Sequence, residues 1–169
     1  MARARAGATP ATVALTEAGI AFELHPYRHD PGSELSFGSE AAAALGVEPR
    51  LVFKTLVVQV TGLARHGGLA VALVPVAESL DLKAVAKALG QKKAVLAPPE
   101  DAQRASGYVT GGISPLGQRT ALPTLIDSSA ENAPRVYVSG GRRGLEVSLA
   151  PGDLAAITDG HFVPVVARR

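Results

Sequence analysis

The order of apolar and polar positions predicts short helices and strands that alternate along the chain. Cap residues followed by apolar residues at helical spacing indicate five helices. These helices are expected to begin at Thr9-Pro10, Ser39, Asp81, Pro98 and Pro151, and Gly19, Gly46 and Gly90 are expected to end the first three. Period-2 alternation, or a short apolar run bounded by glycine or proline, indicates a strand. Such segments occupy residues 21–25, 51–60, 69–74, 95–96, 125–127, 135–138, 145–149 and 162–166.

These elements predict one α/β domain. The strands outnumber the crossover helices that a purely parallel sheet would require, so we expect a mixed, curved sheet flanked by helices. A hairpin-like loop over residues 62–68 would join two of its strands. A length of 169 residues suits a single domain with a sizeable core. We expect residues 1–8 to be a basic extension and residues 9–169 to be the domain.

Composition narrows the class of protein. Hydrophobic residues make up 47% of the chain but aromatic residues only 4%, so the core must be aliphatic. No apolar run is long enough to cross a bilayer, and the basic N-terminus lacks the apolar stretch of a signal peptide, so a cytoplasmic location is expected. The chain contains no cysteine, which excludes disulfides and a cysteine nucleophile. The formal charge of +2 is compatible with an RNA partner but does not indicate one.

One lysine, Lys54, interrupts the apolar strand over residues 51–60. It shares a strand face with Val52, Leu56 and Val58. Because burial of an unpaired ammonium is costly, the charge must reach water, a carboxylate or a ligand. The structural alternative is that Lys54 extends to solvent at the strand end. The functional alternative is a cation that faces phosphate, carboxylate or a developing oxyanion in a cleft.

Two glycine-rich loops could approach a ligand closely. The first contains Gly111-Gly112-Ile113-Ser114, and its free backbone N–H groups could hold a carbonyl oxygen or a phosphate. The second, residues 139–144, adds Arg142 and Arg143. An ordinary tight turn and a solvated hairpin are the structural alternatives for the two loops. Neither loop matches the Walker or dinucleotide-binding pattern.

Other catalytic patterns are absent from the sequence. His25 and His29 are four residues apart, but Pro26 interrupts any helix between them and no third ligand has suitable spacing. We therefore expect no metal and no cofactor. No Gly-x-Ser-x-Gly motif is present, so a serine hydrolase of that kind is not supported.

Ordered segments over nearly the whole chain resemble the YbaK/EbsC family of aminoacyl-tRNA deacylases. This family is related to the editing domain of bacterial prolyl-tRNA synthetases. The segments that carry the resemblance are residues 53–56, 80–90, 107–118, 122–127, 137–141 and 143–145. Each segment is weak alone, but the ordered set is specific. Within the family, the pattern is most similar to that of Cys-tRNA(Pro) deacylases.

The resemblance implies a fold and a set of site residues. The fold would be a compact α/β domain around a barrel-like mixed sheet. Lys54 corresponds to the essential lysine of the family, and Gly111 and Gly112 would present backbone amides to the aminoacyl group. The remaining pocket positions are Tyr27, Thr55, Ile113, Ser114, Ser139 and Glu146, with Arg142 and Arg143 as weaker tRNA contacts. Glu146 stands where the family more often has aspartate, which keeps the charge but lengthens the side chain.

The resemblance also implies a reaction. The enzyme would act on mischarged Cys-tRNA(Pro), with Cys-tRNA(Cys) as a further substrate, and the thiol of the substrate would attack its own ester carbonyl. Such a mechanism suits a chain without cysteine. A prolyl-tRNA synthetase could join the protein and tRNA in a ternary complex, and no membrane partner is expected. The alternatives are an Ala-tRNA(Pro) deacylase that uses bound water, and a non-catalytic aminoacyl-tRNA binding module.

Overall fold

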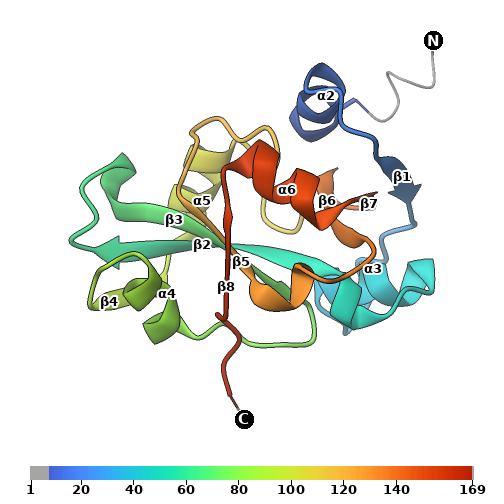
Figure 1. Ribbon diagram of the computed structural model, residues 1–169. Helices are drawn as coiled ribbons and strands as arrows, with labels where there is room; N and C mark the ends of the chain where they lie inside the picture. Colours follow the sequence, from blue (N-terminus) through green and yellow to red (C-terminus); the bar gives the residue numbers. More distant parts are fainter. Residues whose placement is uncertain (1–7, 169) are drawn as a thin grey trace.

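Two β-sheets form the framework of the protein (Figure 1). The computed structural model describes residues 8–168, so most of the expected N-terminal extension lies outside the described residues. The mixed α/β architecture is confirmed. The strands divide into two sheets rather than forming one curved sheet, and residues 8–168 form no closed barrel.

The larger sheet contains five strands of mixed direction. Their order across the sheet is β4 (Lys93–Leu96), β2 (Phe53–Thr61), β3 (Leu69–Pro75), β5 (Thr124–Asp127) and β8 (His161–Val163). β2 runs antiparallel to both β3 and β4, whereas β5 runs parallel to β3 and β8. β8 ends earlier than the expected strand over residues 162–166, because Pro164 has no backbone N–H to donate to a ladder.

The smaller sheet is entirely antiparallel. Its order is β1 (Glu23–Pro26), β7 (Leu145–Leu149) and β6 (Val136–Arg142). β6 is longer than expected and includes most of the second glycine-rich loop, so that only Arg143 and Gly144 turn between the strands. A register shift between Ser139 and Arg142 accommodates the glycines. The two sheets meet where Val52 forms a parallel bridge with Tyr137 of β6.

Within residues 8–168, five α-helices flank the sheets. They are α2 (Pro10–Glu17), α3 (Phe37–Leu45), α4 (Leu82–Ala88), α5 (Pro99–Ser106) and α6 (Pro151–Thr158). The predicted caps Thr9 and Asp81 are confirmed, since their side chains accept hydrogen bonds from Thr12 N and Ala84 N. The predicted start of α3 is wrong: Ser36, not Ser39, is the N-cap, so Phe37 belongs to the helix. No helix of residues 8–168 is long and apolar enough to span a bilayer.

The main core lies between the two sheets and is aliphatic, as expected. Phe53, Leu73 and Ile126 of the larger sheet pack in one cluster with Val138 and Leu149 of the smaller sheet. Helices α2 and α6 contribute Leu15 and Leu154 to the same cluster. A second cluster joins the other face of the larger sheet to α4. The sheets are therefore fixed relative to each other wherever the core fills the space between them.

The first glycine-rich loop is anchored far from its tip. The hydroxyl of Tyr108 donates a hydrogen bond of 2.5 Å to the carbonyl of Leu116, and both residues are buried. The next residue, Gly117, has φ +63°, and a Cβ there would lie only 2.3 Å from the carbonyl oxygen of Pro10. The base of this loop is thus packed against the first turn of α2.

We expect Gly117→Ala to destabilise the protein more than Gly19→Ala does. Both glycines have positive φ, but a Cβ at Gly19 would have no atom within 4 Å. Gly19→Ala should therefore cost only the left-handed backbone strain, about 1–2 kcal/mol. Gly117→Ala should add an overpacking penalty of about 1–3 kcal/mol. Urea unfolding of both variants measures the difference, and equal losses would contradict the packing of this loop on α2.

Candidate active site

The edge of β2 that faces away from β3 is left open along part of its length. Beyond one end of the opening, Val52 bridges to β6, and at the other end pairing with β4 begins at Val58. The carbonyl of Val57 accepts a hydrogen bond of 3.0 Å from Ala97 N, the residue after β4. Residues 54–56 pair with no strand on this side. A gap therefore separates the two neighbours of β2.

A cavity of about 430 Å³ occupies this gap. Its size is within the range of small-molecule sites. Residues from six segments line it. They are residues 36–38, residues 53–57, part of the segment from Leu96 to Ala102 (Leu96, Ala97, Pro99 and Ala102), the glycine-rich loop (Thr110, Gly111 and Ile113), Ser139 of β6 and Glu146 of β7. Lys54, Thr55, Gly111, Ile113, Ser139 and Glu146, which the resemblance singles out, thus line one cavity.

Thr55 turns its polar backbone groups toward the gap. In an antiparallel ladder, alternate residues direct their N–H and C=O groups to the same edge. Because the carbonyl of Val57 points to the β4 side, the N–H and C=O of Thr55 also point to that side, where no strand pairs with them. The open edge therefore offers one backbone donor and one acceptor to a ligand.

Two buried side-chain oxygens in the cavity have no hydrogen-bond partner. They are Oγ1 of Thr55 and Oε2 of Glu146. A buried polar atom without a partner usually costs about 1–3 kcal/mol. In a cavity, such atoms are where a ligand can supply the missing hydrogen bonds. The two orphan atoms come from β2 and β7, one on each sheet, so the site joins the two sheets.

Burial raises the pKa of Glu146 to about 8. The side chain is only 7% exposed, and desolvation disfavours the charged carboxylate. Glu146 is therefore largely protonated at neutral pH and can donate a hydrogen bond. Burial also raises the pKa of the Tyr27 hydroxyl, and the nearby charge of Glu146 adds to this effect. Tyr27 itself does not line the cavity, and its backbone N–H binds Gly144 O at 2.9 Å.

Lys54 is partly buried at the start of β2. Desolvation lowers the pKa of its ammonium, and the charge of Glu78 opposes this shift to a smaller extent. A cation that is partly stripped of water interacts more strongly with a developing negative charge than an exposed cation does. Lys54 thus lines the cavity, and its charge is less well solvated than that of an exposed lysine.

Gly111 and Gly112 have different environments. Gly111 lines the cavity and has φ +89°, and a Cβ there would lie 2.7 Å from Nε of Arg143 and 2.9 Å from the ring of Phe37. Gly112 is buried, and a Cβ there would meet the backbone of Arg142 at 2.8 Å. Its N–H already donates to the carbonyl of Val109 at 2.9 Å. Only Gly111 of the pair therefore lies at the cavity wall.

The predicted serines also have different environments. Ser114 is fully buried away from the cavity, and its Oγ accepts a hydrogen bond of 3.2 Å from Leu116 N. It therefore shapes the glycine-rich loop. Ser139 lies in the cavity beside its cross-strand partner Glu146, and its Oγ accepts a bond of 3.1 Å from Gly141 N.

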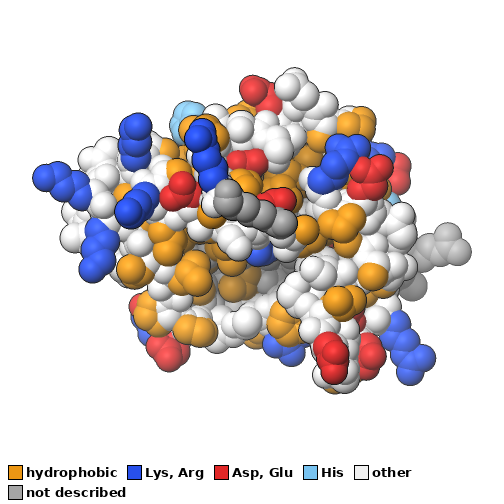
Figure 2. Space-filling model, turned by 90° about the horizontal axis from the view of Figure 1, so that it is seen from below, with side chains coloured by type: hydrophobic (Ala, Val, Ile, Leu, Met, Phe, Trp, Pro, Cys, Tyr) orange, Lys and Arg blue, Asp and Glu red, His pale blue; other side chains and the backbone are white. Residues whose placement is uncertain are grey.

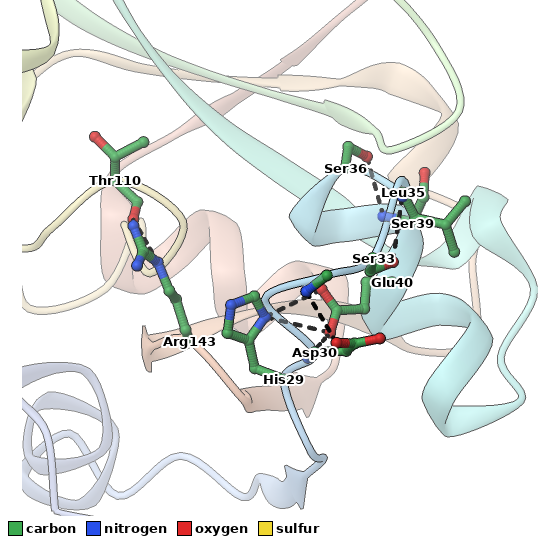
Figure 3. A network of polar contacts seen from close by, with 10 residues as sticks. His29, Asp30, Ser33, Leu35, Ser36, Ser39, Glu40, Thr110 and Arg143 are labelled. Carbon is green, nitrogen blue, oxygen red and sulfur yellow. Dashed lines mark hydrogen bonds and ion pairs between the residues drawn. The ribbon is translucent and has the colours of Figure 1, made fainter.

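Arg143 holds the glycine-rich loop (Figure 3). Its Nε and Nη2 donate to the carbonyl of Thr110 at 3.0 and 2.6 Å. The guanidinium also lies 4.9 Å from the centre of the ring of Phe37, which is the first residue of α3. The predicted tRNA contact Arg143 is thus already engaged with two walls of the cavity. Arg142 is exposed and has no such bond.

A second polar cluster fixes the segment before α3 (Figure 3). The buried carboxylate of Glu40 accepts hydrogen bonds from Asp30 N at 2.6 Å and lies 3.1 Å from Nδ1 of His29. The imidazole of His29 also packs beside the Phe37 ring, with 5.5 Å between the centroids. These contacts determine where Phe37 stands at the cavity mouth.

Sequence reasoning missed several residues of the cavity wall. They are Ser36, Phe37, Leu96, Ala97 and Thr110. The Ser36-x-x-Ser39 spacing was a signal for an earlier start of α3 and would have placed Phe37 on a helix. Nothing in the sequence indicated that β4 and β6 would separate along β2. Residues 8–168 contain no group of three or more His, Cys, Asp or Glu side chains that could hold a metal ion.

Comparison with known proteins identifies a family whose matching region contains the cavity. The sequence profile of the aminoacyl-tRNA editing domain family matches residues 35–157, which include every residue that lines the cavity. A relative in Enterococcus faecalis, named "Putative Cys-tRNA(Pro)/Cys-tRNA(Cys) deacylase EbsC", is 35% identical over 137 residues, which cover 80% of this chain and 81% of the relative.

Solved structures share the fold. The structure of a "putative trans-editing enzyme for prolyl tRNA synthetase" is 24% identical and has a TM-score of 0.80, covering 94% of this chain and 96% of that chain. A hypothetical protein with 23% identity has a TM-score of 0.81, covering 94% of this chain and all of the other. The family and the enzyme class expected from the sequence, an aminoacyl-tRNA deacylase, are therefore confirmed. The chain belongs to the aminoacyl-tRNA editing domain family.

Proposed function

We propose that this protein hydrolyses the aminoacyl ester of mischarged Cys-tRNA(Pro), with Cys-tRNA(Cys) as a second substrate. The observation that carries the proposal is the cavity itself. It presents one cation, Lys54, and two orphan polar oxygens, but no histidine and no cysteine line it. Among residues 8–168, Oγ1 of Thr55 has no hydrogen-bond partner and Oγ of Ser139 accepts from Gly141 N, so neither hydroxyl is hydrogen-bonded to a base that would activate it as a nucleophile. The relative named as a deacylase of these two tRNAs supports the choice of substrate.

In this proposal the substrate supplies the nucleophile. The cysteinyl thiol loses its proton, and the sulfur attacks the carbonyl carbon of the same aminoacyl group. A C–S bond forms, the ester C–O bond breaks, and the terminal ribose hydroxyl of the tRNA leaves with a proton. The resulting cyclic thioester reacts with water and gives free cysteine. The net reaction consumes one water molecule, as ester hydrolysis requires.

The residues of the cavity would orient the substrate and stabilise charge. Lys54 and the backbone N–H of Thr55 would face the oxygen that becomes negative during the attack. Oγ1 of Thr55 and the carboxyl of Glu146 would bind the other polar groups of the aminoacyl ester. Gly111 lets the loop approach the ligand closely, because any side chain there would meet Arg143 and Phe37. The expected contributions are positioning and electrostatic stabilisation.

Comparison of tRNA substrates that carry different amino acids tests this proposal. Purified protein is given Cys-tRNA(Pro), Cys-tRNA(Cys), Ser-tRNA(Pro), Ala-tRNA(Pro) and S-methyl-Cys-tRNA(Pro), and release of the amino acid is measured. We expect rapid hydrolysis of both cysteinyl substrates only. Serine has nearly the same shape, but its hydroxyl is far less acidic than a thiol of pKa about 8.5. A separate binding measurement shows whether the methylated substrate still enters the site.

Other outcomes of this experiment would favour a deacylase that uses water or a non-catalytic binding module. Rapid hydrolysis of the seryl, alanyl or bound S-methyl substrate would show that water is the nucleophile. Tight binding of all substrates without turnover would identify a binding module. Prolyl-tRNA synthetase added to the same reactions tests the proposed ternary complex, which predicts a lower KM in its presence.

Lys54→Ala should lower turnover of Cys-tRNA(Pro) by about 10²–10³-fold, the usual effect of removing one preorganised electrostatic contact. The fold should survive, because Lys54 is partly exposed at the start of β2. Lys83→Ala, on the exposed surface of α4, is the control for the loss of one positive charge. Single-turnover kinetics measures the effect. A folded Lys54→Ala variant that reacts like the Lys83→Ala control would falsify the role of Lys54.

Glu146→Gln should change the pH dependence of stability. The carboxyl has a pKa of about 8 in the folded chain, above its value of 4.5 when exposed, so the folded state binds the extra proton. Stability should therefore fall as pH rises between these values, by up to about 1.4 kcal/mol per pH unit. The glutamine variant should lose this slope. Urea unfolding from pH 5 to pH 8 checks it, and identical slopes would mean that Glu146 is ionised when folded.

A further inference from the structure

A second cavity shares helix α5 as a wall with the active-site cavity. One side of this helix, with Pro99 and Ala102, lines the active-site cavity. Another side, with Asp101, Arg104 and Ala105, lines a cavity of about 510 Å³. A helix with its side chains is about 10–12 Å wide, so two cavities that share α5 as a wall lie close to one another. The residues of the second cavity take no part in the proposed reaction.

The second cavity is lined by charged, polar and apolar residues. Its charged lining residues are two arginines, Arg104 and Arg119, and one carboxylate, Asp101. Leu69 and Leu122 form the apolar part of its wall. Arg104 already pairs with Asp101 at 3.2 Å. The Arg119 guanidinium makes no hydrogen bond or ion pair with any of residues 8–168. One full positive charge in the cavity is therefore not balanced by a carboxylate.

The backbone around Arg119 is fixed. Arg119 N and Thr120 N each donate a 3.0 Å hydrogen bond, to the carbonyls of Ser106 and Ala105 at the end of α5. The guanidinium passes close to Gly107, where a Cβ would lie 3.7 Å from Nε of Arg119. The loop is thus held against the C-terminal turn of α5, which fixes the backbone from which the exposed Arg119 side chain extends.

The opposite wall is a tight turn between β2 and β3. His66, Gly67 and Gly68 all have left-handed backbone, with φ values of +54°, +65° and +83°. The amide of Gln59 donates to the carbonyl of Gly67. Because His66 is not a glycine, its conformation is unusual and carries some strain. This turn places the exposed imidazole of His66 on the cavity wall opposite the two arginines.

Further positive charge surrounds this end of the molecule. Arg65 precedes the turn, and Lys92 and Lys93 lie beside it, since Lys93 pairs with Thr61 at the end of β2. Figure 2 shows Lys and Arg side chains gathered at the left, the side on which the β2–β3 hairpin ends in Figure 1. A ligand at the second cavity would therefore meet a positive local field.

We propose that this second cavity binds a phosphate group, and that the phosphate belongs to the backbone of the tRNA whose aminoacylated end enters the active site. Guanidinium groups suit phosphate because their planar N–H donors match its oxygens. Because both cavities have α5 as a wall, one nucleic acid strand can reach both. The identity of the tRNA ligand rests on the proposed deacylase function, whereas the phosphate-binding chemistry of the cavity does not.

Binding of uncharged tRNA tests the proposal without any turnover. Affinity is measured by fluorescence anisotropy at several salt concentrations for the wild type, Arg119→Ala and Arg104→Ala. We expect Arg119→Ala to weaken binding about tenfold, as the loss of one charge-assisted contact should. The slope of log affinity against log salt should decrease by about 1. Arg135→Ala is the matched control for Arg104→Ala, because Arg135 also pairs with a carboxylate, Glu23, but lies at the smaller sheet.

Kinetics separates this site from the catalytic one. Arg119→Ala should raise KM for Cys-tRNA(Pro) and leave kcat unchanged. Hydrolysis of a cysteinyl ester of adenosine, which has no phosphodiester, should be the same in variant and wild type. A fall in kcat on both substrates would overturn the proposal, because Arg119 would then act on the active site through α5. Thermal unfolding confirms that the variants remain folded.

A second set of ligands distinguishes the source of the phosphate. Inorganic phosphate and adenosine monophosphate are titrated into the wild type and Arg119→Ala. Binding of either that depends on Arg119, together with unchanged tRNA affinity, would overturn the assignment to tRNA and identify the cavity as a site for a small phosphate ligand. Wild-type affinity of both arginine variants for tRNA and for both small phosphates would overturn the proposal. Absence of aminoacyl-tRNA hydrolysis by the wild type would refute only the proposed function.

Discussion

The open stretch of the β2 edge is the constraint on which the site depends. β2 has β6 beside it at Val52 and β4 beside it from Val58 onward, but these two strands belong to different sheets and separate between those points. The polar backbone groups of Thr55 are left without a strand partner. The orphan oxygens of Thr55 and Glu146 face the same gap. Backbone groups that a continuous sheet would pair, and two side-chain oxygens without partners, are therefore concentrated where a substrate can bind them.

The walls of this gap are held by contacts between segments far apart in the sequence. Arg143, in the turn after β6, binds the carbonyl of Thr110 and stacks on Phe37 of α3. Gly111 fits between them only because it has no side chain. Glu40 and His29 then position the start of α3. The loop, the turn and the helix thus support each other before substrate arrives, which favours catalysis by orientation.

The sequence predicted local structure well because caps and periodicity are local signals. Thr9 and Asp81 cap the expected helices, and the strong apolar run became β2. The division into two sheets was not predicted, since strand pairing depends on contacts between distant residues. For the same reason the sequence placed Gly111 and Gly112 together in the pocket, although Gly112 packs against the backbone of Arg142. Lys54 was found from sequence because a cation on an apolar strand face is a local anomaly.

The proposed attack by the thiol of the substrate has a consequence for selectivity. A pocket distinguishes side chains that differ by one methylene group by only about 1–3 kcal/mol. A cavity of about 430 Å³ that accepts a cysteinyl group also has room for other small aminoacyl groups. If the substrate must attack itself, selection no longer rests on fit: an amino acid without a thiol can occupy the cavity and still not react. Correctly charged prolyl-tRNA would then be spared because proline has no thiol, and the protein would need only to hold the ester and stabilise its charge.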